Sequence, residues 1–228
     1  MIRFFRNIRQ KLVAENKVMA YLRYAIGEIV LVVIGILIAL QINNWNETRK
    51  ENISENEFKR AVKNDLKNDK EYIQVIISDA EKKISAYKLL NKELPELYIT
   101  DKKAVDSLLQ IYFVSERTFY PITGSFQSAV SGSEIGKFKD KKTIKMLLKL
   151  YNSVYDRLID NGVLLDNRWE YLVRKYSHIR RSGHLGKMNQ VQISGLLDDL
   201  SYHSKGLVYY VGLLRNTIVE IGQLLKTN

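Results

Sequence analysis

The sequence predicts an all-α protein in which one N-terminal transmembrane helix is followed by an up-and-down bundle of long helices. An uninterrupted apolar stretch lies near the N-terminus, and apolar residues recur at spacings of three and four through most of the remaining chain. Only two prolines occur among 228 residues, so few positions interrupt a helix. These three observations together predict a bundle.

Composition excludes several classes of protein. A mean hydropathy of −0.22 and an apolar fraction of 46% exclude disordered, collagen-like and polytopic membrane proteins. The chain contains no cysteine, which excludes a disulfide framework, a thiolate nucleophile, a zinc ribbon and a lipoprotein anchor. The formal net charge of +11 divides into +4 for residues 1–42, with six basic and two acidic residues, and +7 for the rest, with 30 and 23.

Residues 24–42 read YAIGEIVLVVIGILIALQI and predict a transmembrane helix. At 1.5 Å per residue, about 19 residues span about 28 Å, close to the hydrocarbon thickness of a bilayer. Six basic residues precede the segment against one acid, so the positive-inside rule puts the N-terminus in the cytoplasm and residues 43–228 outside the membrane. Arg23, Tyr24 and Trp45 lie where interfacial anchors occur. A buried core helix is the alternative interpretation.

No small-x-small pair follows the apolar stretch, which favours an uncleaved signal anchor over a cleaved signal peptide. Residues 1–23 are a basic cytoplasmic segment with two open interpretations. Apolar residues at spacings of three and four, with arginines between them, are typical of a helix lying on an anionic membrane surface. An unstructured basic tail fits the same residues.

One acidic residue, Glu28, stands inside the apolar segment, about one turn beyond Arg23. A carboxylate in a bilayer is costly, so Glu28 either lies within reach of the cytoplasmic headgroups or contacts another helix. Gly35 and Ala39 are four residues apart and give a small-residue face on which a second helix can pack. The predicted packing site in the membrane therefore consists of Glu28, Gly35 and Ala39.

Prolines and polar stretches divide the first half of the predicted bundle. Residues 45–93 contain no helix breaker and keep an apolar stripe, so they predict one long helix, closed by Pro95. Asp101 is suited to cap a short helix that ends at Val114. A polar stretch with glycine and serine follows at residues 120–136.

Two further long helices are predicted in the second half. The first begins near Asp140 and carries an apolar stripe as far as Tyr176, with Gly162 as the expected position of a kink. A loop is predicted at residues 180–186. The last helix has a seam of nine positions in steps of three and four: Leu197, Leu200, Ser204, Leu207, Val211, Leu214, Ile218, Ile221 and Leu225.

That seam predicts an intramolecular core, with coiled-coil pairing in an oligomer as the alternative. Three glycines interrupt the same helix, and each weakens it by about 1 kcal/mol relative to alanine. They are Gly206, Gly212 and Gly222, and they predict a close backbone approach.

Two motifs resemble catalytic or phosphate-binding elements but are incomplete. The segment from Gly132 to Lys137 has three residues between its glycines where a phosphate-binding loop has four, and Phe138 follows the lysine instead of serine or threonine. Ser85 and Lys88 match a Ser-x-x-Lys motif, yet the companion elements of that enzyme class are missing. Neither motif therefore predicts an active site.

The remaining ionisable residues do not predict a catalytic or metal site. The three histidines, His178, His184 and His203, form no ligand pair at helical spacing and are expected on the surface or in loops. Carboxylates at Asp65, Asp69 and Glu71 alternate with lysines and predict an exposed, salt-bridged face. We therefore expect no catalytic residue, no metal ion, no cofactor and no small-molecule substrate.

A denser basic patch lies near residue 180. Arg174, Lys175, Arg180 and Arg181 are suited to contact phosphates or other anions. An exterior location argues against nucleic acid, so anionic envelope polymers or lipid headgroups are the expected ligands of this patch.

The segments RFFRNIRQKL, YAIGEIVLVVIGILIALQINNWNE and FYPITGSFQSAVSGSEIGKF are similar to an uncharacterised domain-of-unknown-function family of single-pass envelope proteins from Gram-negative bacteria. The resemblance covers essentially the full chain and is most specific in the membrane stretch. It implies a helical domain without an established activity, anchored in the bacterial inner membrane and facing the periplasm. Among the matching residues, Ser125, Phe126, Ser131 and Gly132 define an expected partner-binding loop.

Three functions remain after these exclusions. The favoured one is a non-enzymatic scaffold or accessory subunit that contacts the lipid bilayer and binds a protein partner or another copy of the chain. The second is a periplasmic helical sensor that works with a separate transmitter, since about 23 residues are too few for a cytoplasmic output domain. The third is a basic module that binds anionic envelope polymers.

Overall fold

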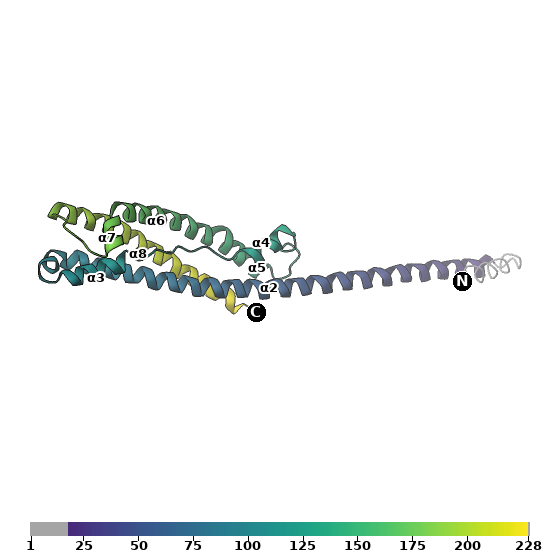
Figure 1. Cartoon of the computed structure of the whole chain (residues 1–228). Coiled ribbons are helices and arrows are strands. Elements are labelled where there is room, and N and C mark those ends of the chain that lie inside the picture. The colour runs from purple at the N-terminus through teal and green to yellow at the C-terminus, as the bar shows by residue number, and fades with distance from the viewer. Residues whose placement is uncertain (1–17, 228) are drawn as a thin grey trace. The chain divides into compact units, whose positions relative to one another are not determined.

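The structure is a computed structural model that describes residues 18–227. Every regular element in that range is helical, which confirms the all-α prediction. The chain divides into two compact units, residues 1–54 and residues 55–228. The helices are α2 (Val18–Thr100), α3 (Lys102–Tyr112), α4 (Gly124–Ser131), α5 (Lys141–Lys149), the π-helix η1 (Leu150–Tyr155), α6 (Asp156–Lys175), α7 (Ser177–Ser182) and α8 (Gln190–Lys226) (Figure 1).

In the first unit, α2 contains a stretch that is long and apolar enough to cross a membrane. Its most apolar 18 residues have a mean hydropathy of 2.6, and none of their side chains is buried by the chain itself. A buried core helix is therefore not what this segment forms in the described structure. Most of the basic segment predicted at residues 1–23 lies outside the described residues.

The prediction that Pro95 closes the helix is wrong, because α2 continues to Thr100. A proline inside a helix removes one backbone hydrogen bond and crowds the carbonyl one turn earlier, at a cost of about 3 kcal/mol. Leu94 is buried and Leu97 packs against the same cluster of side chains. Burial of leucines on both sides of the proline offsets that cost.

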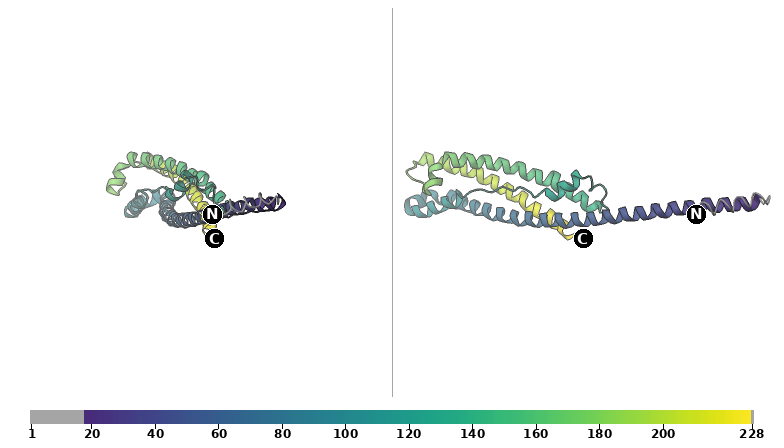
Figure 2. Two further views of the ribbon diagram at one scale, coloured as in Figure 1. Left: turned by 90° about the vertical axis from the view of Figure 1, so that its right-hand side faces the viewer. Right: turned by 45° about the vertical axis from the view of Figure 1, so that its right-hand side comes forward.

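In the second unit, three long helical segments form the bundle: residues 55–100 of α2, the succession α5–η1–α6, and α8. Figures 1 and 2 show α8 running obliquely between α2 and α6. Residues 58–84 of α2 share one core cluster with η1 and the C-terminal part of α8. Residues 86–94 share a second cluster with the end of α6 and the start of α8. Consequently α2 and α6 point the same way and α8 returns antiparallel to both.

The chain returns from the second core to the first between α3 and α4. Asp101 caps α3 as predicted, with its carboxylate accepting a hydrogen bond from the Ala104 amide at 3.1 Å. The helix ends at Tyr112, two residues before the predicted end. Phe113 then packs in the second core and Phe119 in the first, so the segment between them passes from one core to the other without helical structure.

A charged cluster fixes the start of α5 against α2. The Glu55 carboxylate accepts hydrogen bonds from the backbone amides of Lys139 at 2.8 Å and Asp140 at 3.2 Å. Lys59, one turn further along α2, pairs with Glu55 at 3.4 Å and with Asp140 at 3.1 Å. Asp140 also caps α5 by accepting from the Thr143 amide. The position of α5 therefore depends on two carboxylates and one lysine.

The irregularity predicted at Gly162 lies instead at η1, about two to three turns earlier. The apolar stripe in the sequence places Val154 in the core, whereas Tyr155 is buried and Val154 only packs against the edge. The extra residue of the π turn makes this shift. Gly162 is buried within a continuous α6, and a Cβ built there would lie 3.2 Å from Thr118 Cβ and from the Tyr210 hydroxyl.

The last helix bears out the predicted intramolecular seam. Six of the nine seam positions are buried in the two cores: Leu200, Ser204, Leu207, Val211, Leu214 and Ile221. A capping box starts the helix, since Asn189 accepts from the Gln192 amide and the Gln192 side chain accepts from the Asn189 amide, both at 2.9 Å. Of the three glycines, only Gly206 has a close neighbour; Gly212 and Gly222 have nothing within 4 Å of a built Cβ.

Candidate binding groove between α6 and α8

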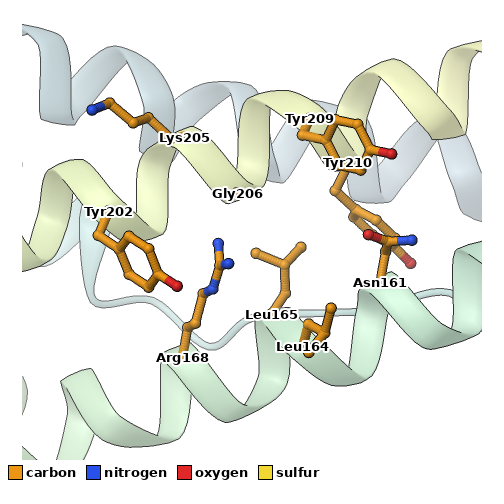
Figure 3. A pocket seen from close by; sticks show the side chains of 9 residues that line it. All are labelled: Asn161, Leu164, Leu165, Arg168, Tyr202, Lys205, Gly206, Tyr209 and Tyr210. Carbon is orange, nitrogen blue, oxygen red and sulfur yellow. The ribbon is translucent and has the colours of Figure 1, made fainter.

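A groove with a cavity of about 380 Å³ opens where α6 and α8 lie against each other. Figure 3 shows that its walls come from both helices. The lining residues are Asn161, Leu164, Leu165 and Arg168 of α6, and Tyr202, Lys205, Gly206, Tyr209 and Tyr210 of α8. A second cavity of about 440 Å³ shares Leu164, Arg168 and Tyr202 with the first, so the two form one groove with Arg168 near its middle.

Helical spacing explains why these side chains line the groove. Leu165, Trp169 and Leu172 bury one face of α6 in the bundle. Leu164 and Arg168 stand beside that face, one turn apart, and therefore point along the seam between the helices. Tyr202, Gly206 and Tyr209 follow the same three-and-four spacing on α8. The groove is thus a second stripe that runs parallel to the core stripe on each helix.

Arg168 is held across the middle of the groove. Its guanidinium carbon lies 4.2 Å from the centre of the Tyr202 ring, a cation–π distance. Gly206 makes this position accessible, since a Cβ built there would lie 2.6 Å from Arg168 Nη1 and 2.9 Å from Leu165 Cδ2. Within the described part of the chain, the Arg168 side chain makes no hydrogen bond or ion pair. Its donors are therefore available to an anionic ligand.

Polar contacts close the groove at both ends. Arg157 Nη2 donates to the Tyr209 hydroxyl at 2.7 Å at one end. At the other end Lys175 Nζ donates to Asp199 Oδ2 at 2.7 Å and to the Tyr171 hydroxyl at 3.0 Å. Asp199 is the only acid among the residues that line the two cavities. Its hydrogen bond raises the pKa of Lys175.

Large apolar and aromatic side chains flank the groove and remain open to solvent. Tyr202 is 60% exposed, Leu164 55% and Tyr209 51%. Tyrosine and arginine are enriched at the energetically important positions of protein interfaces. An exposed group of such residues around a cationic centre is more typical of a binding surface than of an ordinary helix exterior.

Behind the groove lies a network of buried ionisable groups. Glu116 accepts a hydrogen bond from Lys83 Nζ at 3.0 Å and lies 3.2 Å from His203 Nε2. His203, which also lines the second cavity, is fully buried and its Nδ1 is 2.9 Å from the Tyr112 hydroxyl. Lys83 Nζ lies 3.7 Å above the ring of Trp169. The prediction that all three histidines lie on the surface or in loops is therefore wrong for His203.

Hydrogen bonding defines the charge of this network. The Tyr112 hydroxyl lies within hydrogen-bond distance of the Leu200 carbonyl, at 3.1 Å, and of His203 Nδ1. Glu116 is thus shared between the Lys83 amine and the His203 ring. Burial would raise the pKa of Glu116, but the hydrogen bond and charge of His203, together with Lys83, lower it. Burial lowers the pKa of Lys83, which Glu116 only partly offsets.

Another prediction, of an exposed carboxylate face, fails at Asp69. Asp69 is buried, and its carboxylate accepts hydrogen bonds from the Tyr155 hydroxyl at 2.8 Å and the Ile122 amide at 3.0 Å. Desolvation raises the pKa of Asp69, and the charge of Asp65 acts in the same direction. The lysine-rich surroundings in the sequence gave no indication that this carboxylate meets two donors across the bundle.

Among the described residues, Gly35, Ala39 and Trp45 of the predicted membrane segment are exposed on α2. Arg23 Nε donates to the Met19 carbonyl at 3.3 Å, and Trp45 is 65% exposed. A Cβ built at Gly35 meets nothing within 4 Å, so this face is open. Ala39 is exposed on the same helix, while Glu28 and Tyr24 are partly covered.

The predicted basic patch is divided between two helices and partly neutralised. Arg174 pairs with Glu170, and Lys175 pairs with Asp199. Arg180 and Arg181 belong to α7, so the loop predicted at residues 180–186 begins only at Gly183, which ends α7 with φ of +70°. Fewer free cations face solvent here than the sequence indicates.

The predicted partner-binding loop is largely a helix. Ser125, Phe126 and Ser131 lie in α4, and Gly132 is its C-cap. Phe126 is buried and stacks on Tyr151 with ring centres 4.1 Å apart. Phe126 is thus part of the core, and the polar character of its neighbours in the sequence reflects the exposed side of a short helix.

Sequence reasoning missed the residues of the groove. Arg157, Asn161, Leu164, Arg168 and Tyr171 follow one another in steps of three and four, directly beside the apolar stripe of α6. This second stripe was the available signal. It could not be recognised without knowing that α8 places Tyr202 and Gly206 opposite it.

The described fold defines a class: a helical protein with one candidate membrane span and a separately packed helical domain. The chain belongs to the family described as "Family of unknown function (DUF6090)", whose model matches residues 28–180. That match confirms the resemblance to a family without assigned function. No curated protein and no solved structure matches the chain.

Proposed function

We propose that the protein is a membrane-anchored, non-enzymatic scaffold or accessory subunit that presents its helical domain to a protein partner. The exposure of the apolar stretch of α2 supports the proposal most directly. Eighteen residues with a mean hydropathy of 2.6 and no buried side chain would be very unfavourable in water. A bilayer supplies the apolar surroundings that the chain does not supply itself.

The charge distribution supports one orientation in a bacterial inner membrane. The six basic residues before the apolar stretch favour a cytoplasmic N-terminus, and residues 43–228 then lie in the periplasm. Trp45 is exposed at the end of the stretch, where aromatic side chains anchor helices at the membrane surface. The open face at Gly35 and Ala39 offers a contact for a partner helix in the membrane.

Cysteine labelling tests the topology without any background substitution, because the natural chain has no cysteine. Single variants Gln10→Cys and Asn46→Cys are expressed in cells whose outer membrane has been permeabilised, and a membrane-impermeant maleimide is added. We expect Asn46→Cys to react while the inner membrane is still intact and Gln10→Cys to react only after the inner membrane is lysed. The reverse pattern, or release of the protein by an alkaline wash, would overturn the proposed anchoring.

Purification of the full chain in mild detergent tests the partner. A scaffold or subunit should retain another protein in a fixed ratio, and Glu28→Gln should weaken retention if Glu28 contacts that partner. A chain that purifies alone after crosslinking in intact membranes would contradict the proposal.

A further inference from the structure

We propose that the α6–α8 groove binds an acidic peptide segment of the protein partner, with a carboxylate on Arg168 and an adjacent apolar side chain on the groove floor. This inference rests on the proposed function in that it names the partner's chemistry. Its structural basis is a set of residues within the second unit alone.

The first argument is the condition of Arg168. Its side chain is only partly exposed, yet no carboxylate or carbonyl of the described chain accepts a hydrogen bond from it. The Tyr202 ring and the notch at Gly206 hold the guanidinium in one place. A fixed guanidinium loses little conformational freedom when it binds a carboxylate through two parallel hydrogen bonds.

The second argument is charge complementarity. None of the nine residues that line the first cavity is acidic, and Asp199 in the second already accepts from Lys175 and Tyr176. An acidic ligand therefore meets no unpaired carboxylate along the groove. A basic segment would be repelled by Arg168. A neutral segment would cover the guanidinium without supplying a negative charge to pair with it.

The third argument is the nature of the floor and flanks. Leu165 and the ring of Tyr210 give the cavity an apolar floor, and exposed Leu164, Tyr202 and Tyr209 extend the apolar surface along both helices (Figure 3). A small anion would cover only Arg168. A peptide that carries leucine or an aromatic residue beside its carboxylate covers the cation and the apolar surface together.

The test is a selection of random 12-residue peptides on the full chain in nanodiscs of uncharged lipid, followed by measurement of binding affinity. We expect selected sequences enriched in Asp or Glu next to Leu, Phe or Tyr. Arg168→Gln should weaken their binding tenfold or more, the range for a hydrogen bond to a charged group. Gly206→Ala should also weaken binding, because its methyl displaces Arg168 without changing the charge.

Lys205→Gln is the matched control. It removes the same charge from the rim of the same cavity, but Figure 3 shows the Lys205 amine pointing away from Arg168. A change of less than about threefold is expected there, as for an exposed ion pair. Arg168→Lys keeps the charge without the planar geometry and should fall between the wild type and Arg168→Gln. Thermal melts of each variant separate loss of binding from loss of folding.

Several outcomes would overturn the inference. They are selected peptides without acidic enrichment, a selection without binders, and equal losses for Arg168→Gln and Lys205→Gln. Binding of laurate or of anionic vesicles through Arg168, without peptide binding, would assign the groove to lipid instead. The cysteine-labelling result is independent of all these, so a failed groove and a failed anchor are distinguishable.

Discussion

Glu116 is the residue on which the interior of the domain depends most. It is almost fully buried between Lys83 and His203, and Trp169 covers the lysine. The buried Lys83 amine keeps a counter-charge in the core only while that carboxylate is ionised. Substitutions of Glu116 and of Lys83 are therefore not equivalent.

We expect Glu116→Gln to lower the free energy of unfolding by about 3–5 kcal/mol, because it leaves the buried Lys83 amine without a counter-charge. Lys83→Met should cost less, about 1.5–3 kcal/mol, since Glu116 retains His203 as a partner and the methionine fills the space below Trp169. Denaturant unfolding of the full chain in nanodiscs measures both. Trp45→Phe in every variant leaves Trp169 as the single tryptophan reporter. Equal losses would contradict the shared-carboxylate arrangement.

The stability of the domain should depend on pH through the same carboxylate. The pKa of Glu116 is lowered from its ordinary value of 4.5, so its contribution is complete above that value and is lost as pH falls through the folded-state pKa. The pKa of Lys83 is also lowered, from 10.5, because burial disfavours the protonated amine. Its contribution to stability therefore increases as pH rises through the folded-state pKa toward 10.5. Between about pH 3 and 7, the free energy of unfolding of the wild type should fall with increasing steepness as the pH decreases. The free energy of unfolding of Glu116→Gln should depend less on pH over the same range. An equal pH dependence of the unfolding free energy in the two proteins would show that other carboxylates dominate acid unfolding.

At the scale of elements, two glycines, Gly162 and Gly206, allow α6 and α8 to cross closely; the sequence predicts a close approach at Gly206 but only a kink at Gly162. A Cβ at Gly162 would press on Thr118 and on the Tyr210 hydroxyl, which accepts a hydrogen bond from the Phe119 amide at 3.0 Å. Gly212 lies on α8 with nothing within 4 Å of its built Cβ. Chemically identical substitutions should therefore have opposite signs.

We expect Gly162→Ala to destabilise the domain by about 1–3 kcal/mol through overpacking. Gly212→Ala should stabilise it by up to about 1 kcal/mol, the helix propensity gained without a steric cost. Thermal melts of the two variants beside wild type provide the comparison. A stabilising Gly162→Ala would mean that Thr118 and Tyr210 can move apart without cost.

The sequence predicted the helices better than the contacts between them. The seam of α8 and the Asp101 cap follow from spacing and local hydrogen bonding, which are properties of neighbouring residues. The predictions that the helix ends at Pro95 and that Asp69 is exposed are wrong because distant groups decide both features. Core leucines stabilise the helix around Pro95, and Tyr155 and the Ile122 amide donate hydrogen bonds to buried Asp69. The groove combines both cases, since each stripe is local but its partner comes from a helix more than 30 residues away.

At the scale of the whole molecule, the two units differ in whether the chain itself buries their apolar side chains. Residues 55–228 contain two core clusters of their own. The apolar stretch of residues 1–54 has no buried side chain and requires surroundings that the chain does not provide. The family match reaches from Glu28 to Arg180 and so includes parts of both units, while α8 lies beyond it.

The π-helix η1 has a consequence for the length of related chains. A π turn accommodates one more residue than an α-helix over the same rise, so the helices on either side keep their rotation. Asn152 and Ser153 are both exposed. Deleting one of them would convert η1 into ordinary α-helix while α5 and α6 kept their orientation. Between Leu150 and Tyr155, family members can therefore differ by a single-residue insertion or deletion inside a helix, where such changes are otherwise disruptive.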